Sequence, residues 1–128
     1  MTAPQRPLIL VVEDEPSYQH VYQMKLESAG FEVQTANNGE EAVFHCKNQQ
    51  PDLILLDLIM PVKDGFSTLE DLRSDGNCRQ IPIIVTSNLS QDEDIARAME
   101  LGATDYFIKS NVAIGEIPEI IRKHLHTE

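Results

Sequence analysis

Five residues with chemically useful side chains stand where apolar runs of the chain end. They are Glu13, Asp14, Asp57, Thr86 and Lys109. A carboxylate is already ionised at neutral pH, so Asp57 can attack a phosphoryl group without a general base. Phosphoryl transfer mainly requires positioning and stabilisation of negative charge, which the ammonium of Lys109 and the hydroxyl of Thr86 can supply. The set therefore indicates transfer of a phosphoryl group to Asp57.

The three carboxylates of this set would repel one another, because like charges close together disfavour ionisation. A hard divalent cation with oxygen ligands removes that repulsion. Mg²⁺ binds one or two carboxylates, keeps several waters and accepts phosphate oxygens, so we expect Asp14, supported by Glu13, to hold Mg²⁺. Each residue alone is equally well explained as a turn residue or a solvated helix end. Their joint occurrence at strand ends favours a site.

These residues meet only if the strands that precede them are neighbours. Apolar runs and turn residues predict strands that alternate with helices, at residues 8–12, 31–35, 53–56, 81–85 and 104–108. This alternation is typical of a parallel sheet with right-handed crossovers. We expect an α/β fold, a flavodoxin-like doubly wound (βα)5 three-layer sandwich whose five-stranded parallel sheet has the order 2-1-3-4-5. In that order, all five residues lie at one edge.

Capping residues predict where the helices begin and end. Asn38 and Ser90 are each followed three residues later by glutamate, which is the pattern of a capping box. Gly30 is placed to end the first helix. Pro118 cannot lie deep inside a straight helix, so the last regular helix is expected to start near Glu116, after a separate turn.

Composition limits the classes of protein that the chain can represent. With 128 residues, of which 41% are hydrophobic, it is expected to form one globular domain over residues 8–126, after a flexible tail at 1–7. The apolar runs are too short for membrane insertion, and we expect a cytoplasmic location. The net charge of −11 argues against direct nucleic-acid binding. Cys46 and Cys78 are expected to be free thiols.

Several motifs occur together, in a specific order and spacing. They are Val-Val-Glu13-Asp14-Glu15, Leu-Leu-Asp57, Met60-Pro61 with Asp64-Gly65, Val85-Thr86-Ser87, and Gly102-Ala103 through Tyr106 to Lys109. As a set, they resemble the receiver domain of two-component response regulators, in its CheY-like, single-domain form. The resemblance covers the chain from about residue 8 to residue 125.

The resemblance implies that Asp57 accepts phosphate from a phosphohistidine on a sensor histidine kinase or a histidine phosphotransfer protein. It implies that Glu13 and Asp14 form an acidic pair, with Mg²⁺ held by Asp14, Asp57 and the backbone carbonyl of Ile59. The protein is then no enzyme in the usual sense, because it catalyses only its own phosphorylation and dephosphorylation.

The resemblance also implies a switch formed by Thr86 and Tyr106. On phosphorylation the Thr86 hydroxyl moves toward the phosphate, and Tyr106 turns into the vacated space. The surface formed by the fourth helix, the fifth strand and the fifth helix then changes for a downstream protein target.

Two residues depart from the usual family pattern. Ser110 follows Lys109 where the family usually has a proline joined by a cis peptide. A cis bond without proline costs about 3 kcal/mol, so this bond is expected to be trans, or cis and held by its surroundings. Ile59 stands two residues after Asp57, where an apolar side chain would exclude water from the acyl phosphate. We therefore expect slow self-hydrolysis.

Two other functions are compatible with the same fold. The first is a receiver-like interaction module that signals without phosphorylation, which the presence of all five pocket residues disfavours. The second is a Mg²⁺-dependent phosphatase with an aspartyl nucleophile. Such an enzyme would need another acid–base carboxylate near the position of Ile59 and a cap over the site.

Overall fold

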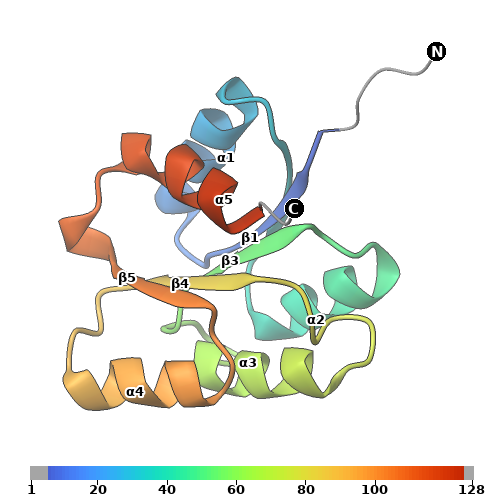
Figure 1. Cartoon of the computed structure of the whole chain (residues 1–128), viewed down its shortest axis with the longest axis vertical. Helices are drawn as coiled ribbons and strands as arrows, with labels where there is room; N and C mark the ends of the chain where they lie inside the picture. Colours follow the sequence, from blue (N-terminus) through green and yellow to red (C-terminus); the bar gives the residue numbers. More distant parts are fainter. Residues whose placement is uncertain (1–5, 126–128) are drawn as a thin grey trace.

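Five parallel strands form a single sheet in the order β2-β1-β3-β4-β5, as predicted. The computed structural model describes residues 6–125 (Figure 1), so most of the predicted tail at 1–7 and the domain end at 126 lie outside the described residues. The strands are β1 (Leu8–Val12), β2 (Glu32–Ala36), β3 (Leu53–Leu56), β4 (Ile83–Ser87) and β5 (Asp105–Ile108). Because β1 and β3 are paired and central, their all-apolar sequences are buried on both faces.

Helices cover both faces of the sheet, which makes the three layers visible in Figure 1. They are α1 (Pro16–Ser28), α2 (Gly39–Asn48), α3 (Gly65–Ser74), α4 (Asp92–Glu100) and α5 (Ile117–Leu125). One apolar core lies between the sheet and α2, α3 and α4, and includes Leu10, Leu69 and Ala98. The other lies between the sheet and α1 and α5, and includes Leu26 and Ile121.

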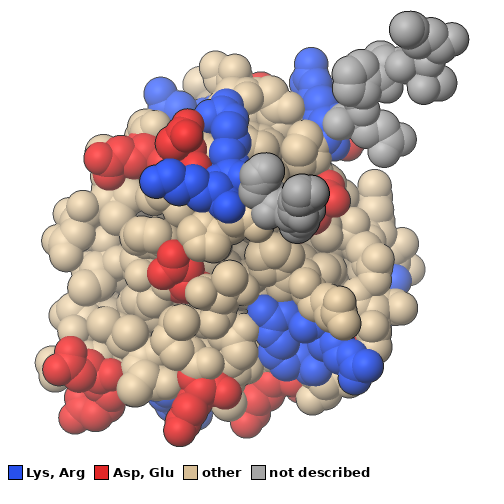
Figure 2. Space-filling model, in the orientation of Figure 1, with Lys and Arg blue, Asp and Glu red and all other residues tan. Residues whose placement is uncertain are grey.

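The start of α4 differs from the prediction. Ser90 does not cap this helix; Gln91 occupies the N-cap position and makes no side-chain capping bond. The first turn instead carries three acidic residues, which complement the positive end of the helix dipole. Figure 2 shows acidic side chains gathered over this part of the molecule. The predicted capping box at Asn38 is half correct: the Asn38 side chain accepts from the Glu41 N–H, but the Glu41 carboxylate accepts from Asn37.

Two strands are shifted by one or two residues from the predicted ranges. The second strand begins at Glu32, because the Phe31 N–H is used to close the preceding helix on Leu26. The fourth runs from Ile83 to Ser87 and therefore continues past Thr86, because Ser87 still pairs with Ile108 of β5.

The C-terminal part agrees with the sequence analysis. Two 3₁₀ turns, η1 (Lys109–Asn111) and η2 (Ile114–Glu116), precede α5, and Pro118 lies in the first turn of that helix. The described residues contain no cis peptide bond, so the bond between Lys109 and Ser110 is trans. Cys46 and Cys78 are free and buried.

No helix within residues 6–125 combines the length and the apolar character needed to cross a membrane.

Candidate functional site

The candidate site lies at the carboxyl edge of the sheet, where β1 and β3 end side by side. Val12 pairs with Leu56, so the residues that follow the two strands are neighbours. The backbone N–H of Asp57 donates to the carbonyl of Val12 at 3.1 Å. Glu13 and Asp57 therefore face the same space from adjacent strands, as the predicted strand order requires.

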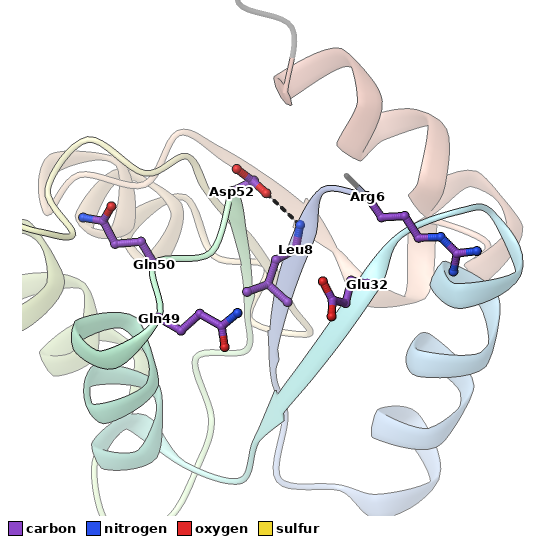
Figure 3. A pocket seen from close by; sticks show the side chains of 6 residues that line it. All are labelled: Arg6, Leu8, Glu32, Gln49, Gln50 and Asp52. Atoms are coloured by element: carbon purple, nitrogen blue, oxygen red, sulfur yellow. Dashed lines mark hydrogen bonds between the residues drawn. The ribbon is translucent and has the colours of Figure 1, made fainter. Parts of the chain in front are cut away.

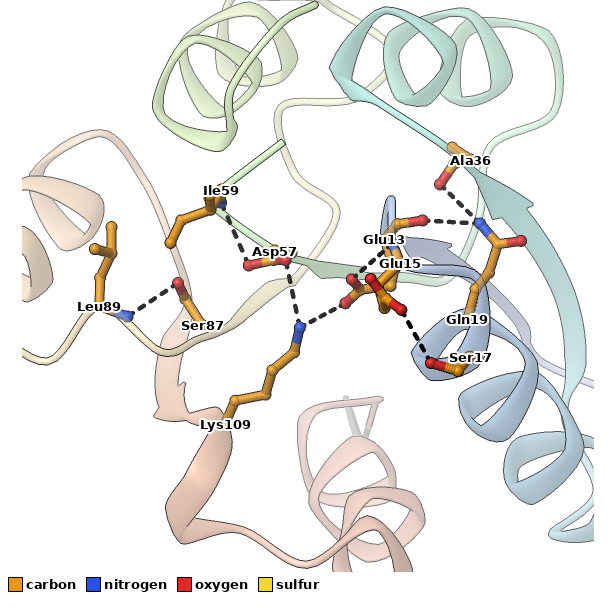
Figure 4. Close-up of polar contacts among 10 residues, drawn as sticks. All are labelled: Glu13, Glu15, Ser17, Gln19, Ala36, Asp57, Ile59, Ser87, Leu89 and Lys109. Atoms are coloured by element: carbon orange, nitrogen blue, oxygen red, sulfur yellow. Dashed lines mark hydrogen bonds and ion pairs between the residues drawn. The ribbon is translucent and has the colours of Figure 1, made fainter. Parts of the chain in front are cut away.

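Lys109 enters this space from the end of β5 and contacts both buried carboxylates (Figure 4). Its Nζ donates to Glu13 Oε1 at 2.7 Å and to Asp57 Oδ2 at 3.3 Å. The three side chains are 7%, 2% and 8% exposed, respectively. At this depth, water screens the ion pairs weakly, so the positions of the three charged groups are strongly coupled.

Burial changes the ionisation of all three groups. Loss of hydration raises the pKa of Glu13 and of Asp57 above their ordinary values, although contact with Lys109 opposes both shifts. Burial alone would lower the pKa of Lys109, but its hydrogen bond with Glu13 and the charges of the two carboxylates raise it overall. The ammonium is thus held in its charged form, whereas the two carboxyl groups bind a proton more readily than they would in water.

The donor set fits a magnesium ion. Glu13, Asp14 and Asp57 each offer a carboxylate oxygen, and these atoms lie within 4.8 Å of one another. Asp14 is exposed, so it can bind an ion that still carries water. One ammonium cannot neutralise three carboxylates, and oxygen donors of this kind suit a hard divalent cation.

The loop after β3 fixes the Asp57 side chain. The Ile59 N–H donates to Asp57 Oδ1 at 3.3 Å. Gly65 closes the loop by donating from its N–H to the carbonyl of Leu58 at 2.9 Å. A Cβ at Gly65 would lie 2.5 Å from Leu58 Cα, so only glycine permits this close approach. The Ile59 side chain remains 56% exposed at the rim of the site.

The same loop contains a strained turn that the sequence analysis missed. Val62 has φ +69°, and the Lys63 N–H donates to the Pro61 carbonyl at 2.7 Å across it. This is the geometry of the γ-turn with a positive central φ, which is rare and strained. A β-branched residue is a poor choice for such a turn, so no sequence signal indicated it.

Thr86 and Tyr106 lie on neighbouring strands, one step apart in the register, because Val85 pairs with Tyr106 and Thr86 with Phe107. Thr86 is buried at the end of β4. The Tyr106 hydroxyl donates to the carbonyl of Leu89, at 2.6 Å, in the loop before α4.

Two tyrosines on α1 complete the site and were not singled out from the sequence. The Lys109 Nζ lies 4.1 Å from the centre of the Tyr18 ring, a cation–π contact. The Tyr18 and Tyr22 rings stack, with centroids 6.1 Å apart. Their spacing of four residues places them on one helix face, which is the only sequence signal that could have identified them.

A second hollow lies at the other end of the strands, away from Asp57 (Figure 3). It has a volume of about 530 Å³ and is lined by Arg6, Leu8, Glu32, Gln49, Gln50 and Asp52. Asp52 Oδ2 accepts from the Leu8 N–H at 2.7 Å, so this carboxylate stabilises the start of β1.

The parallel sheet of order 2-1-3-4-5 and the acidic pocket with its lysine define an α/β domain with a charged site at the carboxyl edge of its strands. Residues 9–122 match the family of response regulator receiver domains, and the chain belongs to that family. The solved receiver domain of sensor histidine kinase PA1611 from Pseudomonas aeruginosa PAO1, with a magnesium ion coordinated in its active-site cleft, is 31% identical, with a TM-score of 0.87. The match covers 96% of this chain and 100% of that one.

Other similar proteins include a chemotaxis protein and two transcriptional regulators. Chemotaxis protein CheY4 from Vibrio cholerae is 25% identical, with a TM-score of 0.87 over 93% of this chain and 98% of that chain. The probable transcriptional regulator ycf27 of Porphyridium aerugineum is 38% identical over 82% of this chain. The DNA-binding dual master transcriptional regulator RpaA of Synechocystis is 37% identical over 80% of it. The chain spans 42% and 43% of the lengths of these two regulators.

Proposed function

We propose that this receiver domain accepts a phosphoryl group on Asp57 from a phosphohistidine of a sensor histidine kinase or a histidine phosphotransfer protein, with Mg²⁺ in the pocket. The observation that carries the proposal is the position of Asp57, whose Oδ2 lies 3.3 Å from the Lys109 ammonium within a cluster of three carboxylates. A cation next to the nucleophile neutralises an incoming phosphoryl group as well as Asp57 itself.

The reaction requires little from the protein beyond position and charge. A carboxylate oxygen of Asp57 forms a bond to phosphorus as the phosphorus–nitrogen bond breaks, and the electron pair of that bond returns to the imidazole. Lys109 contacts an equatorial oxygen of the transferred group. Asp14, Asp57 and the Ile59 carbonyl would hold Mg²⁺, which supplies further positive charge to the phosphoryl oxygens.

The proposed output is a change of surface rather than a further reaction. The Thr86 hydroxyl moves to the phosphoryl group, and Tyr106 then moves into the space that it leaves. The face formed by α4, β5 and α5 changes for a downstream protein. Beyond its own phosphorylation and dephosphorylation, the chain is proposed to catalyse no reaction.

Two further parts of the proposal concern location and nucleic acid. We place the protein in the cytoplasm. We also propose that this stretch of chain does not itself bind nucleic acid, because its net charge of −11 opposes contact with phosphates. The similarity to RpaA does not bear on this point, because the chain matches only 43% of that DNA-binding regulator.

Intact mass spectrometry tests the proposal directly. Wild type and Asp57→Asn are incubated with acetyl phosphate, with and without Mg²⁺. We expect a gain of one phosphoryl group in the wild type alone and only with Mg²⁺. An unchanged wild-type mass, together with no binding of beryllofluoride, would instead support an interaction module that works without phosphate.

A further inference from the structure

The Lys109 ammonium has three N–H groups, and three side chains of the pocket surround it. Two are carboxylates, since Nζ lies 2.7 Å from Glu13 Oε1 and 3.3 Å from Asp57 Oδ2. The third is Tyr18 on α1, whose ring centre lies 4.1 Å from Nζ. The Lys109 side chain is almost fully buried among these groups, so the ring covers a side of the ammonium that water would otherwise hydrate.

Two neighbouring residues of α1 fix the position of the Tyr18 ring. The buried Tyr22, one turn later, stacks on it, with ring centroids 6.1 Å apart and planes inclined by 28°. The side-chain amide of Gln19 donates to the backbone carbonyl of Glu13 at 2.8 Å, which ties the first turn of α1 to the end of β1. Tyr18 is itself 40% exposed. The ring therefore forms part of the rim of the pocket while its face contacts the lysine.

The contact between Tyr18 and Lys109 restrains the ammonium. The face of an aromatic ring carries negative potential and attracts a cation, more strongly where water is excluded. This attraction opposes rotation of the lysine side chain away from the carboxylates. Glu13 and the Tyr18 ring each engage one N–H, which leaves the third N–H for Asp57, where the proposed function places the phosphoryl group.

We propose that Tyr18 is a positioning residue that directs the Lys109 ammonium at the phosphoryl group on Asp57. This role rests on the proposed function, in which Lys109 contacts an equatorial oxygen of that group. A fixed and dehydrated cation stabilises developing negative charge better than a mobile, hydrated one, because little has to reorganise when the group arrives. An aliphatic side chain at position 18 would cover Lys109 without attracting it.

Initial rates of Asp57 phosphorylation by acetyl phosphate with Mg²⁺, followed by intact mass spectrometry, test this role. Tyr18→Leu retains an apolar side chain but removes the ring. We expect its rate at subsaturating acetyl phosphate to fall about three- to tenfold, the range of a partly exposed cation–π contact. Tyr18→Phe retains the ring face and should match wild type. A wild-type rate in Tyr18→Leu, or an equal fall in Tyr18→Phe, overturns the proposal.

Fluorination separates the charge distribution of the ring from its shape. Pentafluorophenylalanine at position 18 retains a ring of similar size but reverses the potential on its face, so the ring no longer attracts an ammonium. We expect its phosphorylation rate to fall at least as far as that of Tyr18→Leu. A rate equal to that of Tyr18→Phe would show that the ring acts only by packing and would overturn the proposal. Val21→Ala, at an exposed neighbour on α1, controls for general weakening of the helix and should match wild type; a fall as large as that of Tyr18→Leu also overturns it.

Beryllofluoride binding gives an equilibrium measurement of the same effect, since beryllofluoride with Mg²⁺ imitates the phosphoryl group on aspartate. The half-saturating concentration, followed by ¹⁹F NMR, should rise in Tyr18→Leu by a similar factor and stay unchanged in Tyr18→Phe. No rise in Tyr18→Leu overturns the proposal. If the wild type is neither phosphorylated nor bound by beryllofluoride, the proposed function fails as well. If the wild type shows both and the Tyr18 variants behave like it, only the positioning role of Tyr18 is removed.

Discussion

Lys109 and Glu13 form a buried ion pair, with Nζ 2.7 Å from Oε1 and side chains 7% and 2% exposed. The ammonium is closer to Glu13 than to Asp57, the proposed phosphoryl acceptor, from which it lies 3.3 Å. Glu13 therefore anchors the lysine and leaves it within reach of Asp57. In the proposed function, this arrangement lets one cation stabilise the pocket and also contact the phosphoryl group on Asp57.

Replacing Lys109 by methionine is expected to destabilise the fold strongly at pH 7. The change retains most of the side-chain volume but leaves the buried carboxylates of Glu13 and Asp57 without a cation. Breaking a buried pair in this way costs about 3–5 kcal/mol. Urea unfolding in the absence of Mg²⁺ measures the loss. Lys25→Met, at an exposed position on α1, is the control, and equal losses in the two variants would contradict the expectation.

The raised pKa of Asp57 predicts how stability depends on pH. A carboxyl group with a higher pKa in the folded state binds its proton more tightly there, so its ionisation weakens the fold. This contribution declines as pH rises from the ordinary value, 3.8, through the raised pKa of the folded state. The Asp57→Asn substitution removes this pH-dependent contribution to the free energy of unfolding. The stability advantage of Asp57→Asn over wild type should grow between pH 4 and pH 7, measured by urea unfolding without Mg²⁺; a constant difference would count against the raised pKa.

Val62→Gly is expected to stabilise the protein by about 0.5–1 kcal/mol. Val62 has φ +69°, a conformation that costs an L-residue about 1–2 kcal/mol, part of which the greater flexibility of unfolded glycine offsets. The Val62 side chain is 73% exposed, so little packing is lost. Thermal or urea unfolding measures the gain. Val62→Ala keeps the positive φ penalty and should show no comparable gain; if it stabilises as much as glycine, backbone strain is not the cause.

Ile59→Asn is expected to shorten the lifetime of phosphorylated Asp57. An apolar side chain at the rim keeps water from the acyl phosphate, whereas an amide can hold a water beside it. A change of about tenfold corresponds to ~1.4 kcal/mol in the barrier. Loss of the phosphoryl group is followed by mass spectrometry after removal of the donor. Phe44→Asn, an exposed apolar position on α2, should leave the rate unchanged, and a faster rate in wild type than in Ile59→Asn would refute the role of Ile59.

The sequence alone predicted the order of the strands and helices and the charged residues of the pocket. Apolar runs such as 8–12 and 53–56 are local signals of buried strands, and each ends at a carboxylate. Alternation of strands with helices then permits few topologies. The order of the sheet consequently brings Asp57, Glu13 and Lys109 together without knowledge of any side-chain contact.

Tertiary structure decided how the pocket is held. The Lys109 ammonium pairs with a residue 96 positions away in the chain, and its contact with Tyr18 depends on how α1 packs against the sheet. The γ-turn at Val62 contradicts the local preference of valine, and Gln91 rather than Ser90 is the N-cap residue of α4. Local patterns specify which backbone conformation each segment prefers. Contacts between distant segments form only when the helical layers pack against the sheet. These contacts set the positions of the charged groups in the pocket and the backbone strain in the loop beside it.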